Sequence, residues 1–493
     1  MTSKNQKSIK LNFIMNAILT LSGFIFPLIT FPYVSRILLP AGMGKVAMAT
    51  SVVAYFALLA RLGIPMYGIR ACAGVRDDKQ ALSKMVHELF LINFLMAMVS
   101  YALFFGTVFF VPKLAEERLL YIIVSLTIFF EMLGVDWLYR ALEEYAYITK
   151  CSLAFKVIAV VAMFVLIHEQ SDYVVYGSIT VLAACGSYLL NFYNLRKHIS
   201  SSLFDNYNLK QHMTPILVFF ATSCAIVIYT QLNTVMLGFL KSPADVGLYD
   251  SAMKIKNILV SFVTALGAVL LPRASYYVKN ELYDDFARIT SKAVQFVCLL
   301  AIPLVVYFTI FASDGIYFFS GPRFAGAIVP MQIIMPTVLF IGLTNIIGIQ
   351  VLVPLGREKD VFYSVLVGGI VDLAVCALLI PGYGVVGAAA ANMIAEFSVL
   401  VVQLILVAKY KDKVDIIKGL KTVSYSKIVV AIVLAVGASV GCKLLAWHAF
   451  FVLALSGTVF FAVYGLCLYV LKEKFLLEIL VPVKAKLREK LGL

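Results

Sequence analysis

The chain has 493 residues, of which 62% are hydrophobic and 14% are charged, with a formal net charge of +14 and a mean hydropathy of +0.95. Soluble domains carry about 25% charged residues, so this composition excludes an ordinary soluble protein. A helix crosses the roughly 30 Å core of a bilayer with about 20 apolar residues, and runs of that length recur along the whole sequence. The chain is therefore predicted to be a multi-pass membrane protein.

The apolar runs are continuous and do not alternate with polar residues, which indicates helices and not the strands of a barrel. We therefore predict an all-α membrane protein with fourteen transmembrane helices. The run after "MTSKNQKSIK" is too long for a signal peptide, so the first helix is expected to be retained. The expected helices cover residues 12–36, 46–66, 86–111, 119–139, 151–168, 173–194, 213–239, 248–271, 293–311, 329–353, 362–380, 386–408, 428–446 and 450–471.

The basic residues are unevenly divided between the two sides of the predicted membrane. With the N-terminus in the cytosol, the inner segments contain 30 Lys or Arg residues and the outer segments contain seven. Because loops rich in Lys and Arg stay in the cytosol, both termini are expected on that side of the membrane. Basic residues dispersed over all inner segments favour anionic lipid headgroups as partners and argue against a nucleic acid.

The first and seventh predicted helices contain several polar residues inside apolar surroundings. Asn16 belongs to a polar row on the first helix, and Asn233 belongs to a similar row on the seventh. Such rows either line a water-filled cavity or form hydrogen bonds between helices, and both interpretations stay open. Arg36 and Arg70 lie near opposite ends of the first helix pair, where they either pass an anion along or anchor the helix ends in the interface.

Arg61 is the single charged residue of its predicted span. It lies 16 residues after Lys45, which places it about 24 Å from the outer end of the helix at about 1.5 Å per residue. An arginine at that depth costs about 3 kcal/mol or more unless it is offset. It either snorkels to the cytosolic interface or faces a water-filled cavity, where its guanidinium fork would bind an anion.

A short repeat divides the chain into two halves. "PAGMGKVAMA", which begins at Pro40, matches "PADVGLYDSA", which begins at Pro243, at four positions and an offset of 203 residues. Two six-helix bundles related by an axis along the membrane normal would explain this offset, although a generic P-x-x-x-G turn that occurs twice is the alternative. The expected parts are residues 1–212, residues 213–411, and residues 412–493 with two extra helices and a basic tail.

The eighth predicted helix carries a polar stripe. Asp250, Lys254, Asn257, Ser261 and Thr264 are separated by steps of four and three, so they share one face of a helix. This face is expected to line a cavity, whereas an ion pair between Asp250 and Lys254 would neutralise the lysine locally. The next basic residue along the chain, Lys256, falls on another face.

Several acids fall within or near the predicted spans. Asp136 stands four residues before Arg140, which predicts an ion pair. Asp372, Asp250 and Glu396 are candidates for coupling transport to an ion, because a buried carboxyl group can take up a proton or help to bind Na⁺. The sequence leaves the choice of ion open.

The sequence offers few signs of catalysis. Eight cysteines are scattered without C-x-x-C spacing, and no two of the five histidines are spaced to share a metal on one helix. No P-loop, G-x-S-x-G or dinucleotide-binding motif is present. We therefore expect no metal site and no cofactor. The longest outer segment, residues 312–327, is too short to form a catalytic domain outside the bilayer, so a transporter is favoured over an enzyme. A membrane glycan polymerase or ligase is the alternative from another class.

Six stretches, taken with their order and spacing, resemble the polysaccharide-transporter branch of the multidrug/oligosaccharidyl-lipid/polysaccharide exporter superfamily. That resemblance implies a V-shaped fold of fourteen helices with a cationic central cavity, and undecaprenyl-diphosphate-linked repeat units of O-antigen or capsule as cargo. It assigns no definite role to individual residues, because the family has no strongly defined catalytic motif. The stretches are "RILLPAGMGKVAMATSVVAYFALLARLGIPMYGIR", "GVDWLYRALEEYAYIT", "DVGLYDSAMKIKN", "FSGPRFAGAIVPMQIIMP", "GIQVLVPLGREKD" and "IPGYGVVGAAAANMIAE".

We therefore expect a flippase that carries a polyprenyl-diphosphate-linked oligosaccharide to the outer leaflet by alternating access. Its expected partners are this cargo, membrane lipids, and a polysaccharide polymerase with its export machinery. A lipid II flippase or a multidrug antiporter of the same fold is the alternative within transport. The residues expected to line the cargo cavity are Arg61, Lys254, Arg70, Arg36, Asn257, Ser261, Asn16 and Asn233.

Overall fold

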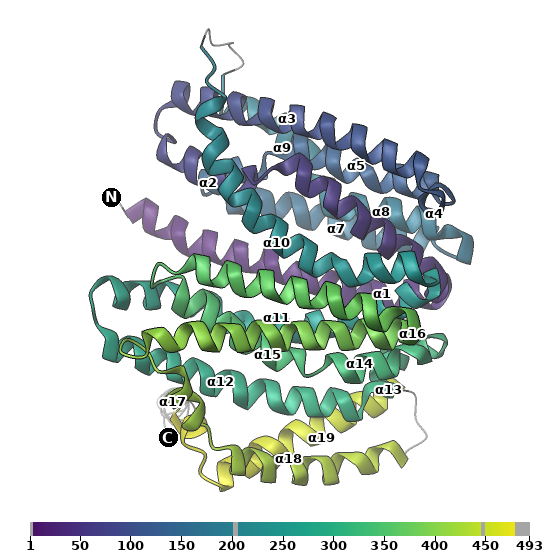
Figure 1. The fold of residues 1–493 in the computed structure, drawn as a ribbon, viewed down its shortest axis with the longest axis vertical. Helices are drawn as coiled ribbons and strands as arrows, with labels where there is room; N and C mark the ends of the chain where they lie inside the picture. The colour runs from purple at the N-terminus through teal and green to yellow at the C-terminus, as the bar shows by residue number, and fades with distance from the viewer. Residues whose placement is uncertain (1–2, 201–205, 445–448, 479–493) are drawn as a thin grey trace. The chain divides into compact units, whose positions relative to one another are not determined.

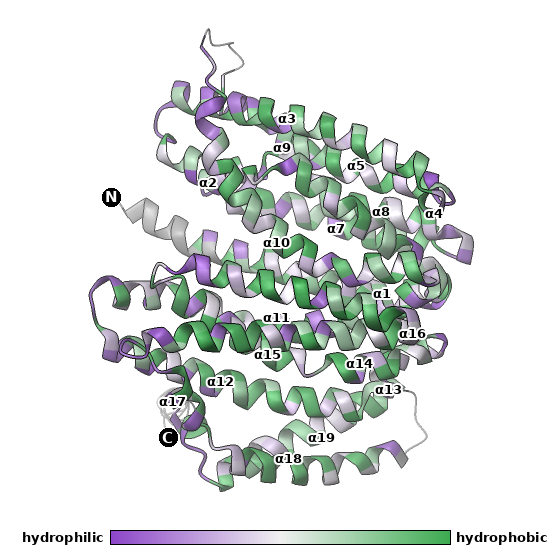
Figure 2. Ribbon diagram, viewed as in Figure 1, coloured by the Kyte–Doolittle hydropathy of each residue, from purple (hydrophilic) through white to green (hydrophobic). Residues whose placement is uncertain are grey.

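The computed structural model describes residues 3–200, 206–444 and 449–478, and these residues form helices and connecting segments without a strand (Figure 1). The chain divides into two compact units, Met1–Asp250 and Ser251–Leu493. The predicted parts, with boundaries at residues 212 and 411, stay a prediction. Hydrophobic residues dominate the lengths of the helices, and polar residues gather at their ends (Figure 2). This distribution is typical of helices that cross a bilayer.

The first unit contains ten α-helices, counted over its described residues. α1 is long because it covers the first two predicted spans, with a break at Leu39, whose φ is 57°. Pro40 follows directly, and proline restricts the residue before it, so the break falls where the sequence favours one. The helices are α1 (Ser3–Arg61), α2 (Ile64–Gly74), α3 (Lys79–Phe110), α4 (Pro112–Ala115), α5 (Arg118–Gly134), α6 (Asp136–Ala141), α7 (Tyr145–Leu166), α8 (Tyr173–Cys185), α9 (Ser187–Asn194) and α10 (Lys210–Leu240).

The second unit begins within α11 and continues to α19. α16 covers the eleventh and twelfth predicted spans and breaks at Gly384, whose φ of 52° suits a residue without a side chain. The helices are α11 (Pro243–Lys279), α12 (Tyr283–Ile310), α13 (Ala312–Phe319), α14 (Ile328–Ile334), α15 (Thr337–Asn345), the π-helical η4 (Ile346–Leu352), α16 (Glu358–Val407), α17 (Ile416–Lys421), α18 (Tyr425–Val440) and α19 (Ala449–Val470).

Within the described ranges, nine helices are long and apolar enough to cross a membrane, or up to eleven if each of two bent pairs counts as one span. The protein is thus an all-helical multi-pass membrane protein. The count of fourteen and the arrangement as two bundles of six stay predictions. Several predicted spans coincide with parts of longer or shorter helices, because α1 and α16 each cover two of them and α5 has 17 residues.

The two copies of the repeat meet within the first unit. A Cβ atom on Gly44 would lie 1.7 Å from the carbonyl oxygen of Pro243, and one on Gly247 would lie 2.0 Å from the carbonyl oxygen of Pro40. Both distances are far below van der Waals contact, so each glycine is required for the close approach of the other copy's backbone. The contact is reciprocal, because equivalent positions of the two copies exchange roles.

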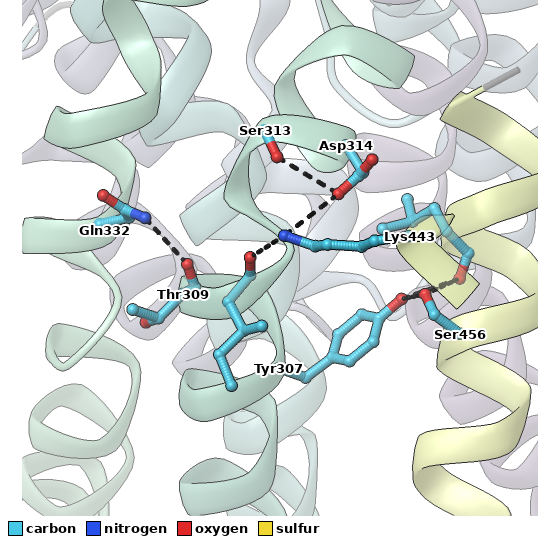
Figure 3. Close-up of polar contacts among 9 residues, drawn as sticks. Tyr307, Thr309, Ser313, Asp314, Gln332, Lys443 and Ser456 are labelled. Carbon is cyan, nitrogen blue, oxygen red and sulfur yellow. Dashed lines mark hydrogen bonds and ion pairs between the residues drawn. The ribbon is translucent and has the colours of Figure 1, made fainter. Parts of the chain in front are cut away.

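In the second unit, polar contacts fasten the C-terminal helices to α12 and α13 (Figure 3). The hydroxyl of Tyr307 donates to the carbonyl oxygen of Leu453 at 2.8 Å and lies 2.9 Å from the hydroxyl of Ser456. Lys443 donates to the carbonyl oxygen of Ile310 at 2.7 Å, and its Nζ atom lies 3.7 Å from a carboxylate oxygen of Asp314. Because a cation near a helix C-terminus is favourable, Lys443 stabilises the end of α12.

Candidate functional site

The ends of α1, α5 and α6 surround a pocket in the first unit, which we call the arginine pocket. It has a volume of about 300 Å³. Its apolar lining residues come mainly from the start of α2, with Trp137 from α6. Its polar lining residues are Arg61, Asn93, Glu131, Asp136, Arg140 and Tyr188.

Local sequence features place Arg61 in the lining of this pocket. α1 ends at Arg61, and the chain turns at Gly63, whose φ is 75°. A Cβ atom on Gly63 would lie 2.6 Å from the carbonyl oxygen of Ile216 on α10, so glycine is required here for space as well as for conformation. The guanidinium donates from Nε to the carbonyl oxygen of Ala57 at 3.3 Å, within the last turn of α1. Arg61 also lines a neighbouring pocket of about 180 Å³ beside α10.

The partner of Arg61 is an acid from another helix. Its Nε atom lies 3.2 Å from Oε2 of Glu131, and the two side chains are 36% and 16% exposed. Glu131 lies in the last turn of α5, which ends at Gly134. A Cβ atom on Gly134 would lie 2.5 Å from the ring of Tyr188, so this glycine allows the tyrosine to lie against the end of α5.

A second ion pair follows at the start of α6. Asp136 and Arg140 are separated by one turn, and Nε of Arg140 lies 2.6 Å from Oδ2 of Asp136. The predicted pairing of these residues is confirmed. Asp136 is the first residue of α6, where the helix dipole favours a negative charge. Val135, between α5 and α6, has a φ of 36°, which is strained for a β-branched residue and marks a sharp change of chain direction.

A second polar pocket adjoins the first, and we call it the hydroxyl pocket. Its volume is about 260 Å³, and it shares Asp136, Arg140 and Tyr188 with the arginine pocket. Lys156 on α7 brings a third cation and donates to the hydroxyl of Ser22 at 2.7 Å. Amide and hydroxyl groups complete its polar lining, namely those of Asn16, Thr20, Ser152 and Ser187.

The two pockets bring together some of the residues expected from the sequence and leave others apart. Arg61 lines the arginine pocket and Asn16 lines the hydroxyl pocket. Arg70 is exposed on α2, Arg36 donates to the carbonyl oxygen of Pro32, and Asn233 is buried in α10. None of these three lines either pocket. Their roles in a cargo cavity stay predictions.

Sequence reasoning assigned no cargo role to Arg140, Lys156 or Glu131. Lys156 carried one usable signal, because it is a charged residue in an apolar span, "LAFKVIAVV", without an acid nearby in the sequence. Arg140 is accounted for in the sequence by its predicted ion pair with Asp136, so the sequence gives no reason to expect it in the lining of two pockets. No sequence pattern connects Glu131 with Arg61, because their contact depends on how α1 packs against α5.

In the second unit, the polar stripe of α11 is partly exposed. Asn257 is exposed, Lys254 and Ser261 are half-buried, and the hydroxyl of Ser261 donates to the carbonyl oxygen of Ile258 at 2.6 Å. Lys256 is 4% exposed, as expected for a residue on another face. Asp250, the remaining candidate for ion coupling on this helix, is the last residue of the first unit.

Lys256 shares the interior of the second unit with two acids of α16. Asp372 is 0% exposed and Glu396 is 7% exposed, and both lie within electrostatic range of the Lys256 ammonium group. The helices α14 and α15, with η4, pack against α16 and contain no titratable residue. Two of the acids proposed for ion coupling are therefore gathered around one buried lysine.

Over the described residues, no group of three His, Cys, Asp or Glu side chains is placed to hold a metal ion. The sites built by this fold are instead ion pairs and hydrogen-bonding groups.

Comparisons with known proteins find relatives and similar folds that are named as transporters or flippases. The chain is 21% identical over 410 residues to a protein of Escherichia coli (strain K12) assigned as an O-antigen transporter, covering 83% of this chain and 98% of that protein. Its fold is similar to the lipid II flippase MurJ in an inward closed conformation, with a TM-score of 0.71, 16% identity, and coverage of 94% of this chain and 98% of that chain.

A second solved structure of similar fold is an inward-facing multidrug resistance MATE family transporter of the MOP superfamily. Its TM-score is 0.62 and its identity is 11%, over 81% of this chain and 99% of that chain. The fold is thus shared by proteins named for different cargoes, and the fold alone does not select one of them. The family model described as polysaccharide biosynthesis protein matches residues 9–278, which is more than half of the chain. The chain belongs to the polysaccharide biosynthesis protein family.

Proposed function

We propose that the protein is a flippase that moves a polyprenyl-diphosphate-linked oligosaccharide from the cytosolic to the outer leaflet of the plasma membrane. The observation that carries this proposal is the pair of adjoining pockets among the helices of the first unit, with Arg61, Arg140 and Lys156 in their walls. Family membership and the match to almost the full length of an O-antigen transporter support a polysaccharide unit as cargo.

The chemistry of the two pockets fits the two polar parts of such a cargo. A guanidinium group presents parallel N–H donors that match the oxygens of a phosphate, and Arg61 and Arg140 lie in the walls of the same pocket. The amide and hydroxyl groups of Asn16, Thr20 and Ser152 are suited to sugar hydroxyls in the hydroxyl pocket. The polyprenyl tail needs no pocket, because it can remain in the lipid.

The transport cycle that we propose is alternating access between two bundles, with both termini in the cytosol. Asp372 and Glu396, together with Lys256, form the site in the second unit that we propose for ion coupling. Their burial supports this role, because charged groups inside a membrane protein are expensive and are retained mainly for function. A polymerase and export machinery would receive the cargo on the outer side.

A lipid II flippase is the second candidate function, since the fold similarity to MurJ covers nearly the whole chain. Both candidates carry a diphosphate, so the cationic pockets serve either, and the candidates differ in the sugars. A glycan polymerase or ligase is less favoured, because the relatives are named as transporters or flippases.

The proposal is tested in cells by replacing the native protein with an Arg61→Ala variant. A loss of transport would raise the amount of lipid-linked repeat units on the cytosolic side, while a polymerase defect would leave single units on the outer side. Arg288→Gln is the control, because Arg288 is 67% exposed in an ion pair with Asp285 and lies in the second unit. Normal export by the well-expressed Arg61→Ala variant would contradict the proposed role of the arginine pocket.

A further inference from the structure

The arginine pocket contains buried polar atoms that have no hydrogen-bonding partner. Oδ1 of Asn93 accepts no hydrogen bond although this residue is 3% exposed. Oε2 of Glu131 is in the same condition and has only the ion-pair contact with Arg61 at 3.2 Å. Buried polar atoms are nearly always hydrogen-bonded, and each exception calls for an explanation. Both atoms are acceptors that lack a donor, so the carboxylate of Glu131 is held in this pocket with little besides Arg61 to stabilise its charge.

The charges around the pocket are balanced before a ligand enters. Arg61 from α1 faces Glu131 from α5, and Arg140 faces Asp136 within α6. The other titratable groups that face Glu131 are the phenol of Tyr188 from α9 and the thiol of Cys185 from α8, both of which are neutral when protonated. The lining residues from α2 and α3 carry no charge.

A diphosphate diester brings two negative charges into this balanced site. With Lys156 of the adjoining pocket included, three cations would then face the two cargo charges and both acids. One negative charge is left over, and an uncompensated charge is unfavourable among membrane helices. The excess is removed if one acid takes up a proton.

Glu131 is the acid best placed to take up this proton. Asp136 accepts a 2.6 Å hydrogen bond from Arg140, its neighbour one turn along α6. Glu131 has one cationic partner, and Oε2 of its carboxylate lacks a hydrogen bond. If a phosphate takes that partner, the carboxylate of Glu131 loses the group that stabilises its charge.

We propose that Glu131 is an internal competitor for the cargo diphosphate, a proposal that rests on the flippase function. In the empty protein the carboxylate of Glu131 forms an ion pair with the guanidinium group of Arg61. When the cargo phosphate binds the guanidinium, the Glu131 carboxylate leaves it and takes up one proton from water, and no covalent bond of the cargo changes. The amide N–H group of Asn93, which lines the same pocket, can then donate a hydrogen bond to a phosphate oxygen.

This exchange links cargo affinity to pH. The occupied protein holds one proton more than the empty protein, so a fall in pH favours the occupied form. In the range where Glu131 is ionised when the site is empty, the affinity rises by about tenfold for each unit of falling pH. If Glu131 stayed ionised and paired with Arg61 when the cargo binds, the affinity for the cargo would not depend on pH in this range.

The test measures proton uptake by the full-length protein in lipid nanodiscs during calorimetric titration with an undecaprenyl-diphosphate-linked monosaccharide, which is a diphosphate diester, in buffers of different ionisation enthalpy. We expect about one proton per bound molecule for the wild type, beyond the protonation change of the free ligand. Glu131→Gln is expected to bind about tenfold or more tightly and to take up no such proton. Glu143→Gln is the matched control, because Glu143 is 51% exposed in an ion pair with Arg76.

The outcomes separate this inference from the proposed function. Binding by the wild type without proton uptake overturns the inference and leaves the flippase function standing, and this result needs no variant. Proton uptake that persists in Glu131→Gln also overturns it, because another group would then be responsible. If neither the wild type nor Glu131→Gln binds the diphosphate, the proposed function itself fails.

Discussion

Nε of Arg61, at the end of α1, lies 3.2 Å from Oε2 of Glu131, in the last turn of α5. This contact explains how an arginine is tolerated inside a predicted transmembrane span, because an acid from a neighbouring helix balances its charge. It also sets the chemistry of the arginine pocket. A ligand with a negative charge must compete with Glu131 for the guanidinium.

The ion pair predicts a specific pattern of stability. Arg61→Ala is expected to lower the stability of the first unit by about 1–2 kcal/mol, because it leaves Glu131 without a cation while Arg61 itself is 36% exposed. Adding Glu131→Gln should recover most of the loss. Thermal unfolding of the two single variants and the double variant in detergent measures the coupling. Additive effects would show that the two side chains do not interact.

Gly63 is expected to be intolerant of a side chain. Gly63→Ala places a Cβ atom 2.6 Å from the carbonyl oxygen of Ile216 at a φ of 75°, so a loss of about 2 kcal/mol or more is expected. Gly74→Ala is the control, because a Cβ atom there meets nothing within 4 Å. The melting temperatures of the two variants are compared. Equal melting temperatures would mean that the turn between α1 and α2 adapts more freely than its geometry indicates.

The reciprocal contact of the repeat predicts that two distant glycines behave alike. Gly44→Ala and Gly247→Ala should each force a backbone displacement, since the added atoms would lie 1.7 Å and 2.0 Å from carbonyl oxygens. Each variant should lose export activity, and their effects should not add because both disrupt one contact. Gly437→Ala, which meets nothing within 4 Å, should retain activity. A fully active Gly44→Ala variant would show that transport does not require the close contact between Gly44 and the backbone of Pro243.

The buried lysine of the second unit predicts a strong effect with a defined rescue. Lys256→Met leaves Asp372 and Glu396 without their neighbouring cation, so the yield of folded protein should fall severalfold. Lys256→Met combined with Asp372→Asn should restore much of that yield, because one negative charge is removed with the positive one. Size-exclusion chromatography of the solubilised protein provides the measurement. If Lys256→Met alone gave as much folded protein as the wild type, Lys256 would not be needed to balance the charges of Asp372 and Glu396.

The sequence predicts the class of fold because a bilayer demands long apolar helices, and these are visible as continuous runs. It also indicates breaks such as the one before Pro40, since proline restricts the residue that precedes it. The continuation of α16 through residues 381–385 is not predicted from the same kind of signal. Pro381 and Gly384 favour an interruption, and only packing decides whether the chain leaves the helix or bends within it.

The candidate site was predictable in part. Arg61 and Asn16 were recognised because a polar residue in an apolar span needs an explanation, and the i, i+4 spacing of Asp136 and Arg140 predicted their ion pair. The contact of Arg61 with Glu131 and the approach of Lys156 to α1 depend on the packing of separate helices. A single sequence contains no periodicity that reports such packing.

The most direct test of the account is the rate at which purified protein in liposomes moves a fluorescent lipid-linked oligosaccharide diphosphate between leaflets. Arg61→Gln, Arg140→Gln and Lys156→Gln are each expected to slow this movement at least tenfold, while Arg288→Gln leaves it unchanged. Wild-type rates in a folded protein that lacks all three pocket cations would contradict the claim that these residues hold the diphosphate during transport.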